Sequence, residues 1–423
     1  MSYPDSVRYL YALGNELRSG AKFGIERVRT LLTELGNPEH GKRFVHVAGT
    51  NGKGSTCAMI ASMLRESGSR TGLFTSPHLI EPTERIQING CAITHAEFAA
   101  AFEVVHAAAE RLLKQDRIDA HSSYFETITA MALVIFRDRC EISVLEVGLG
   151  GRLDATNVVM PALCVITQIG FDHEAFLGNT LEAIASEKAG IIKPGVPVVI
   201  SPQLPQAERV MSDRAAELGC NLIRTPHASE LSATAFGSTF SIDGVPYECP
   251  LPGRHQVENA ITAITACREL GVSTNAIQAG LKKAQWPGRL EFISRNPDFV
   301  LDGAHNPAGA ETLAAYIREF CAHRPVWMVY GGMRDKAVEE ITGRLFPLAD
   351  HLIVTAPDFP RALRAEAILA AHDHPNTSVT RNVSNAVELA RTAPKDAIVF
   401  FTGSLYLVGE ARAALLGRRV PVS

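Results

Sequence analysis

The sequence lacks the features that mark secreted proteins, membrane proteins and zinc ribbons. Eight cysteines are scattered along 423 residues, with no CxxC pair and no spacing that suits a disulfide framework. Nowhere do about 18 apolar residues follow one another, the length that spans a bilayer, and the N-terminus has no basic start followed by an apolar run. We therefore expect a cytoplasmic protein with reduced thiols and no membrane partner.

A surplus of positive charge is also missing. The chain has 41 Lys and Arg against 45 Asp and Glu, a net charge of −4, and its pI is about 6.4. Such a balance excludes the basic surface that binds nucleic acid, so we expect small-molecule partners. A monomer is the default expectation. With 46% apolar and 20% charged residues, the chain has the composition of a globular protein, and its length favours two domains.

Short apolar runs alternate with longer helical patterns in the first part of the chain. Four runs have the composition of buried parallel strands: VHVAG near residue 45, VLEVG near 144, ALCVITQIG at 162–170 and VPVVI at 196–200. Between them, GSTCAMIASMLRESG and FETITAMALVIFRDR carry apolar residues at three- and four-residue spacing, which is typical of crossover helices. The region 225–250 is rich in Ser, Thr and Gly and predicts small antiparallel strands.

A second series of strands and helices begins near residue 298, with FVLDG, VWMVYGG, HLIVTAP and AIVFFTG as its strands. Pro287 and Gly288 punctuate the junction between the two series. The pattern predicts an α/β protein with an N-terminal domain, residues 1–290, on a mostly parallel sheet. A smaller Rossmann-like α/β domain follows at residues 291–423.

The stretch GTNGKGST follows the first predicted strand and opens a helix. Its glycines let backbone N–H groups approach phosphate, Lys53 can reach a transferable phosphate, and Ser55 or Thr56 can hold Mg²⁺. The match to GxxxxGK[ST] is imperfect, because Val47 stands at the first glycine and Gly54 separates the lysine from the serine. A plain glycine turn with a solvated lysine is the alternative. Because strand, loop and helix follow in the required order, we predict a P-loop-type ATPase domain.

Further motifs extend along the whole chain. They are FTSPHL (74–79), ERIQING (84–90), YFETIT (124–129), LEVGLGGRLDATN (145–157), GFDHEAFLG (170–178), EKAGIIKPG (187–195), HQVENA (255–260), PGR (287–289), LDGAHNP (301–307), YGGMRDK (330–336) and GSLYLVGEAR (403–412). Together with GTNGKGS, they resemble the Mur ligase superfamily and, within it, the folylpolyglutamate synthase and dihydrofolate synthase family. Several motifs are six or more residues long and they cover both predicted domains, so chance agreement is negligible.

The resemblance implies an ATP-dependent amide ligase. A carboxylate is a poor electrophile in water, and phosphorylation by ATP turns it into an acyl phosphate that the amine of L-glutamate can attack. The implied acceptors are dihydropteroate and tetrahydrofolates, and an enzyme limited to the second activity is the alternative. The tasks left to the protein are alignment, charge neutralisation and exclusion of water.

The resemblance also implies roles for individual residues. Those expected to bind ATP are Asn51, Gly52, Lys53, Gly54, Ser55, Asn259, Arg289 and Asp302. Two Mg²⁺ ions, which prefer oxygen ligands, are expected near Ser55, Ser76, Glu146 and His173. The pterin is expected at Arg85, Phe125, Arg152, Leu153, Asp154 and Ala155. Glutamate is expected at Asp302, His305 and Ser404. Lys53, Lys188 and His305 are the expected catalytic side chains, with Lys188 carbamylated by CO₂.

Taken without the resemblance, several of these residues have plainer interpretations. His173 is then a loop residue at the surface, Lys188 a solvated lysine near a helix end, and Arg289 a surface arginine at a domain end. Phe125 is then part of the core, and Ser404 is a helix cap without a ligand.

Three other functions compete with a folate ligase. A cell-wall precursor ligase would normally carry a further N-terminal domain, and the phosphate loop starts too early to leave room for it. A nucleotide switch or simple phosphotransferase would leave LDGAHNP and GSLYLVGEAR without a role. A folate-binding protein that has lost catalysis is disfavoured, because competent residues fill every expected metal and phosphate position.

Overall fold

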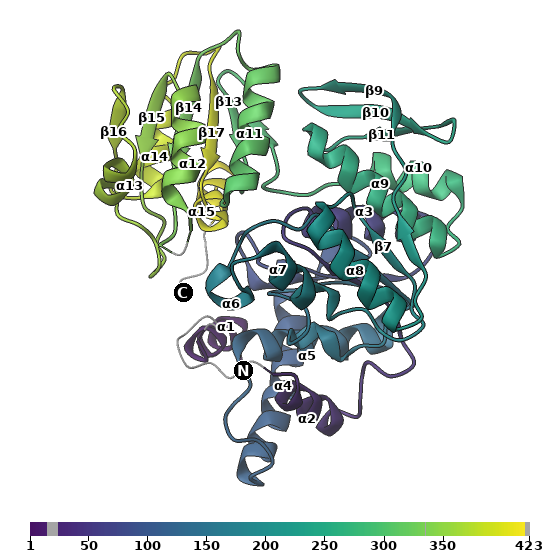
Figure 1. The fold of residues 1–423 in the computed structure, drawn as a ribbon. Coiled ribbons are helices and arrows are strands. Elements are labelled where there is room, and N and C mark those ends of the chain that lie inside the picture. The colour runs from purple at the N-terminus through teal and green to yellow at the C-terminus, as the bar shows by residue number, and fades with distance from the viewer. Residues whose placement is uncertain (15–23, 335, 419–423) are drawn as a thin grey trace.

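The computed structural model describes residues 1–14, 24–334 and 336–418. It contains two α/β units, each built on its own large sheet, and a small three-stranded sheet beside the first unit (Figure 1). The α/β class and the two sheets, one large and mostly parallel and one smaller, confirm the predicted architecture. No helix in these described ranges combines the length and the apolar character needed to cross a membrane.

Eight strands form the large sheet in the order β4-β3-β2-β5-β1-β6-β7-β8. Six are parallel, and β3 and β4 pair antiparallel at one edge. The strands are β1 (Arg43–Ala48), β2 (Thr71–Phe74), β3 (Ile86–Ile88), β4 (Cys91–Ala92), β5 (Ile142–Glu146), β6 (Leu163–Ile166), β7 (Val198–Ile200) and β8 (Leu222–Arg224). Strands β5 and β6 are buried along their whole length, as expected for parallel strands covered on both faces.

Helices cover both faces of the large sheet (Figure 1). One face packs against α3 (Lys53–Glu66), α9 (Arg254–Glu269) and α10 (Thr274–Lys282). The other face packs against α4 (His95–Lys114) and α5 (Tyr124–Arg139) at one end and against α7 (Leu181–Ala189) and α8 (Pro205–Glu217) at the other. The short helices α1 (Tyr3–Ala12) and α2 (Glu26–Glu34) lie outside α4 and α5, and α6 (Glu174–Leu177) precedes α7.

Strand β1 illustrates why these residues form a central strand. Phe44 joins the core beneath α4 and α5, whereas Val45 and Val47 join the core beneath α3 and α9. Because side chains alternate between the two faces of a strand, an apolar residue is needed at successive positions. The run FVHV meets this requirement except at His46, which is buried and hydrogen-bonded through Nε2 to Thr156 Oγ1 at 2.8 Å.

A three-stranded antiparallel sheet occupies the region predicted at 225–250. Its strands are β9 (Ser229–Thr234), β10 (Gly237–Ile242) and β11 (Val245–Cys249), with β10 in the middle. Phe240 and Tyr247 join the core that α3 and α9 share, which attaches this sheet to the first unit.

The second unit has six strands in the order β12-β13-β17-β14-β15-β16, all parallel except β12. They are β12 (Glu291–Ser294), β13 (Asp298–Leu301), β14 (Val326–Tyr330), β15 (His351–Val354), β16 (Thr377–Val379) and β17 (Ile398–Thr402). One face packs against α11 (Pro307–Phe320), α12 (Val338–Leu345) and α13 (Ala365–Ala371), and the other against α14 (Val383–Ala390) and α15 (Leu405–Leu415).

Candidate active site

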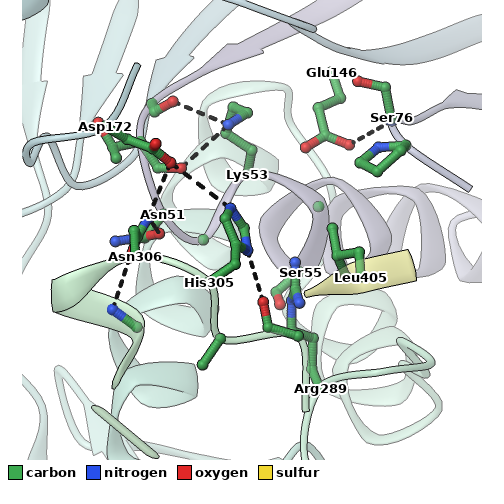
Figure 2. Close-up of a pocket in the computed structure, with 18 of the residues that line it drawn as sticks. Asn51, Lys53, Ser55, Ser76, Glu146, Asp172, Arg289, His305, Asn306 and Leu405 are labelled. Atoms are coloured by element: carbon green, nitrogen blue, oxygen red, sulfur yellow. Dashed lines mark hydrogen bonds and ion pairs between the residues drawn. The ribbon is translucent and has the colours of Figure 1, made fainter. Parts of the chain in front are cut away.

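A cavity of about 340 Å³ lies between the two α/β units (Figure 2). The first unit contributes the phosphate loop and the segments that follow β5 and β6. The second contributes the segments that follow β13 and β17. Ligands of open α/β sheets bind outside the carboxyl ends of the strands, and both sheets present those ends here.

The phosphate loop is held in shape before any ligand binds. Gly52 has φ +85°, and a Cβ there would collide with the side-chain amide of Asn259. A Cβ on Gly54 would lie 2.7 Å from the Trp286 ring. The backbone N–H of Thr50 donates to the Gln168 carbonyl at 2.9 Å. The loop leads directly into α3, whose first backbone N–H groups have no partner within the helix, and a helix N-terminus of this kind is suited to phosphate.

Two lysines share one carbonyl of this loop. Lys53 Nζ donates to the carbonyls of Gly49 at 3.1 Å and Thr50 at 3.2 Å, and Lys188 Nζ donates to Gly49 at 2.8 Å. Lys188 is 5% exposed, so the interpretation of a solvated lysine is wrong. Burial, helped by the charge of Lys53, lowers the pKa of Lys188 from 10.5 to about 7. A substantial share of its amine is therefore neutral near pH 7.

The expected metal ligands Ser55, Ser76 and Glu146 line the cavity with His173. Glu146 ends β5, is 4% exposed, and accepts one hydrogen bond from the Ser76 backbone N–H at 3.0 Å. Burial raises its pKa, which the charge of Lys53 opposes. A buried carboxylate that accepts this hydrogen bond, in a cavity that two serines also line, supplies oxygen donors of the kind that Mg²⁺ prefers.

The cavity holds no complete metal cage of its own. Among the described residues, no three His, Cys, Asp or Glu ligand atoms of the cavity lie within 4.8 Å of one another. Mg²⁺ commonly keeps several waters and takes further oxygens from substrate phosphates. The residues present therefore fit an ion that arrives together with a nucleotide.

Asp172 joins the two units across the cavity. It follows β6 and accepts hydrogen bonds from Lys336 Nζ at 2.6 Å and Asn306 Nδ2 at 3.1 Å. His305 Nε2 lies 3.7 Å from the same carboxylate. Burial alone would raise the pKa of Asp172, but the neighbouring His305 imidazole and the Lys336 charge outweigh it and hold the pKa well below its usual range. Asp172 is thus an anion that accepts from the His173 backbone N–H of its own unit at 2.9 Å. It also accepts from Lys336 and Asn306 of the second unit.

Sequence reasoning did not single out Asp172, Asn306 or Lys336. All three lie in motifs that the sequence shows, GFDHEAFLG, LDGAHNP and YGGMRDK. Asn306 also donates to Asn51 Oδ1 at 3.0 Å, which ties the phosphate loop to the second unit (Figure 2). The signal was present in the motifs, but nothing in the sequence showed that these three residues meet.

Comparisons with known proteins agree with this geometry. The Mur ligase middle domain matches residues 47–267, and the Mur ligase glutamate ligase domain matches residues 288–405. A dihydrofolate synthase/folylpolyglutamate synthase of Bacillus subtilis is 37% identical over 431 residues, covering 98% of this chain and 99% of the relative. This chain belongs to the Mur ligase family.

Solved structures of this ligase family have the same fold. The Mycobacterium tuberculosis folylpolyglutamate synthase complexed with ADP matches with a TM-score of 0.91 and 31% identity, covering 98% of this chain and 99% of that one. Escherichia coli FolC in complex with DHPP and ADP matches with a TM-score of 0.86 and 32% identity, covering 97% and 98%. The Mur ligases are ATP-dependent ligases, so this chain is an enzyme of that class.

Two residues expected to bind substrates in this Mur ligase accept hydrogen bonds from backbone N–H groups. Asp302 accepts from the N–H groups of Leu290 and Ala304, both at 3.0 Å, and so fixes the junction between the units. Ser404 caps α15 by accepting from the Leu407 N–H at 3.1 Å, which confirms the helix-cap geometry. Both also line the cavity.

Arg289 and Asn259 line the same cavity, as expected. Arg289 follows Gly288 at the junction of the two units, and its guanidinium lies against Gly303. Asn259 donates to Gln256 Oε1 at 3.0 Å, and Gln256 donates to Ser55 Oγ at 3.2 Å. This chain of hydrogen bonds connects α9 to the phosphate loop.

The expected pterin residues divide into two groups. Arg85 and Phe125 line the cavity, together with Tyr124, which the sequence did not indicate. The Arg85 guanidinium lies over the Tyr124 ring, 5.1 Å from its centroid. Phe125 is 7% exposed and packs in the core, which confirms the core interpretation, and its contact with a pterin stays a prediction.

The second group of expected pterin residues does not line the cavity. Its members are absent from the described residues that form the cavity wall: Arg152, Leu153, Asp154 and Ala155. Asp154 instead accepts from the N–H groups of Gly148 and Leu149, at 3.0 and 2.9 Å. Residues 146–150, at the end of β5 and in the turn that follows, do line the cavity. Asp154 therefore holds the conformation of this turn through the Gly148 and Leu149 N–H groups without lining the cavity itself.

Proposed function

We propose that this protein adds L-glutamate to dihydropteroate and to tetrahydrofolates, using ATP to make an acyl phosphate. The observation that carries the proposal is the placement of the phosphate loop on one wall of the cavity and His305, Asn306 and Lys336 on the other. A nucleotide on the loop would have its terminal phosphate directed at residues of the second unit. The Bacillus subtilis relative has both activities in its name, and the Escherichia coli structure holds DHPP and ADP.

The chain is proposed to work as two domains, residues 1–290 and 291–423. The large sheet and the small antiparallel sheet end before residue 250, and the second sheet begins at Glu291. Polar contacts of Asp172 and Asn51 with the second unit cross the cavity. Closure of the two domains would therefore assemble the site and exclude water from the acyl phosphate. The expectation of a monomer belongs to this proposal and is checked by light scattering.

Each residue then has a task in positioning or charge. Lys53 and the N–H groups at the start of α3 would bind the ATP phosphates. Ser55, Ser76, Glu146 and His173 would hold Mg²⁺, which when bound would neutralise phosphate charge. His305, with Nδ1 donating to the Gly303 carbonyl at 2.7 Å, keeps Nε2 toward Asp172 and the cavity.

Lys188 is proposed to react with CO₂. The neutral amine attacks the carbon of CO₂, one proton leaves to solvent, and an anionic carbamate forms beside the Lys53 ammonium. Burial supplies the neutral amine, and the Lys53 charge would favour the product anion. The added oxygens would place negative charge close to the phosphate loop, where Mg²⁺ is expected.

The test measures ADP release and identifies products by mass, with ATP, Mg²⁺ and L-glutamate present. Parallel reactions contain dihydropteroate, tetrahydrofolate or no pterin. We expect glutamate-dependent release with both acceptors, while a reaction with tetrahydrofolate alone would identify a folylpolyglutamate synthase. Lys53→Ala should abolish ligation, and Lys114→Ala, which alters an exposed lysine on α4, should not. ADP release without pterin and glutamate would refute the ligase.

A further inference from the structure

A cluster of potential metal ligands lies outside the cavity, beside the N-terminal helices. His106 and Glu110 are one turn apart on α4, and His121 lies in the segment between α4 and α5. One ligand atom from each of the three residues lies within 4.8 Å of the other two. Across the part of the chain that the structure describes, no other group of His, Cys, Asp and Glu meets this condition, and none of the three residues lines the cavity.

The two imidazoles have nitrogen atoms that protein groups leave unused. His121 Nδ1 lies 3.2 Å from the Ser122 carbonyl, which can only accept, so Nδ1 carries the hydrogen and Nε2 keeps a lone pair. This Nε2 is buried without a hydrogen-bond partner and lies 3.6 Å from Glu110 Oε1. His106 Nδ1 is likewise buried and without a partner. Buried polar atoms of this kind are uncommon, because each loses its hydration.

Aromatic neighbours hold the imidazoles in place. Phe102 stacks on His106 with ring centroids 5.3 Å apart, and Tyr9 contacts the same imidazole from the other helix at 4.6 Å. The His106 and His121 rings are 5.5 Å apart. The neutral form of an imidazole is the one that can ligate a metal. The Ser122 carbonyl also gives His121 the outer hydrogen bond that metal-ligating histidines usually have.

We propose that His106, Glu110 and His121 bind a Zn²⁺-like transition-metal ion with one coordination position open to water. Bonds of about 2.0–2.2 Å in a tetrahedral site put ligand atoms roughly 3.4 Å apart, close to the 3.6 Å between His121 Nε2 and Glu110 Oε1. Two imidazoles and one carboxylate suit Zn²⁺ or Co²⁺ and disfavour Mg²⁺. The proposal does not depend on the ligase activity.

The ion would connect α4 to the start of α5. His121 is two residues before Ser123, the N-cap of α5, whose first residues Tyr124 and Phe125 line the cavity. Fixing His121 to α4 therefore stabilises the end of the helix that forms one wall of the cavity. The role assigned to the ion is structural.

Binding is tested on the full-length protein after chelation and dialysis, with Zn²⁺ or Co²⁺ titrated in excess Mg²⁺. We expect one ion per chain, an intense visible absorption with Co²⁺ that indicates low coordination number, and a higher Tm with Zn²⁺. His121→Gln and Glu110→Gln should each weaken binding about tenfold or more. Glu110 has a 40% exposed side chain, so its variant tests the site even where His121→Gln does not fold.

His323→Gln is the matched control, because it removes an exposed histidine far along the chain and should leave the affinity and the Tm shift unchanged. The proposal would be overturned if the wild-type protein bound no Zn²⁺ in the presence of excess Mg²⁺. It would also be overturned if the Glu110→Gln variant bound Zn²⁺ as tightly as the wild type. Weakening by His323→Gln to the same extent would also overturn it, since binding would then be a general property of surface histidines.

Discussion

Replacing Lys188 by Met should stabilise the first domain at low pH. The lysine is fully buried, and its pKa is lowered by burial, with help from Lys53, from 10.5 to about 7. Methionine has a similar length and no charge. The carbonyl of Gly49, which accepts from Lys188, still accepts from Lys53 at 3.1 Å in the variant. The main change is therefore the removal of a buried ammonium.

The sign follows from proton linkage. Below about pH 7 the folded and unfolded chains both carry the ammonium, and the folded chain bears its full desolvation cost. Between about pH 7 and 10.5 only the unfolded chain stays protonated, so wild-type stability rises with pH in this window. The difference between the two pKa values corresponds to at most about 5 kcal/mol. Subtracting about 1 kcal/mol for the lost hydrogen bond leaves the variant about 4 kcal/mol more stable near pH 6 and about 1 kcal/mol near pH 9.

The assay is urea unfolding of Lys188→Met and wild type at several pH values in CO₂-free buffer. A Trp327→Phe background leaves Trp286, which packs in the core of the first domain, as the fluorescent probe. Lys114→Met serves as the exposed-lysine control and should not alter the pH dependence. A variant that is less stable than wild type near pH 6, or a difference that does not shrink as pH rises, would refute the reasoning. Added bicarbonate should stabilise only proteins that retain Lys188, because a carbamate forms only in the folded site.

Two further predictions concern the cavity. Asp172→Asn and Lys336→Met should each lower kcat/KM for ligation. Because the two groups are a largely buried pair, the double variant should show a coupling energy of about 2 kcal/mol or more. Additive effects of the two substitutions would show that the pair does not act together. Gly52→Ala should raise the KM for ATP about tenfold or more, since its Cβ collides with Asn259 at a positive φ. Gly343→Ala, where a Cβ meets nothing within 4 Å, should leave KM unchanged, and an equal rise in both variants would contradict the steric explanation.

The sequence predicted most of the buried parallel strands and, from Ser, Thr and Gly content, the more exposed strands of the region 225–250. AIVFFTG contains a continuous apolar run and forms β17, whereas VHVAG and VLEVG, which form β1 and β5, are each interrupted by one buried polar residue, His46 or Glu146. The strands that it missed, β2, β3, β4, β8, β12 and β16, have two to four residues each, and TGLF of β2 has only two adjacent apolar residues. Their pairing depends on neighbouring strands more than on local composition, so tertiary context decided them.

Site residues that are adjacent in the sequence could be predicted from local sequence, whereas contacts across the cavity could not. The phosphate loop is contiguous, so its chemistry can be recognised from eight letters. Asp172 and Lys336 are 164 positions apart, and their pairing requires both sheets to be formed. The burial of Lys188 is equally hidden, because α7 is a short helix whose sequence LEAIASEKA has only weak amphipathic character.

The two kinds of contact around the nucleotide loop imply that binding and closure can be separated. Asn259, Trp286 and the Gln168 carbonyl all belong to the first 290 residues, and they constrain the loop whether or not the second domain is close. Asn306 and Lys336 reach Asn51 and Asp172 from the second α/β unit, and under the proposed domain closure these bonds form only when the two units approach. A substitution in the first set should therefore change ATP affinity directly. A substitution in the second set should leave ATP bound and lower the fraction of complexes that close, so its effect should appear in kcat more than in the ATP dissociation constant.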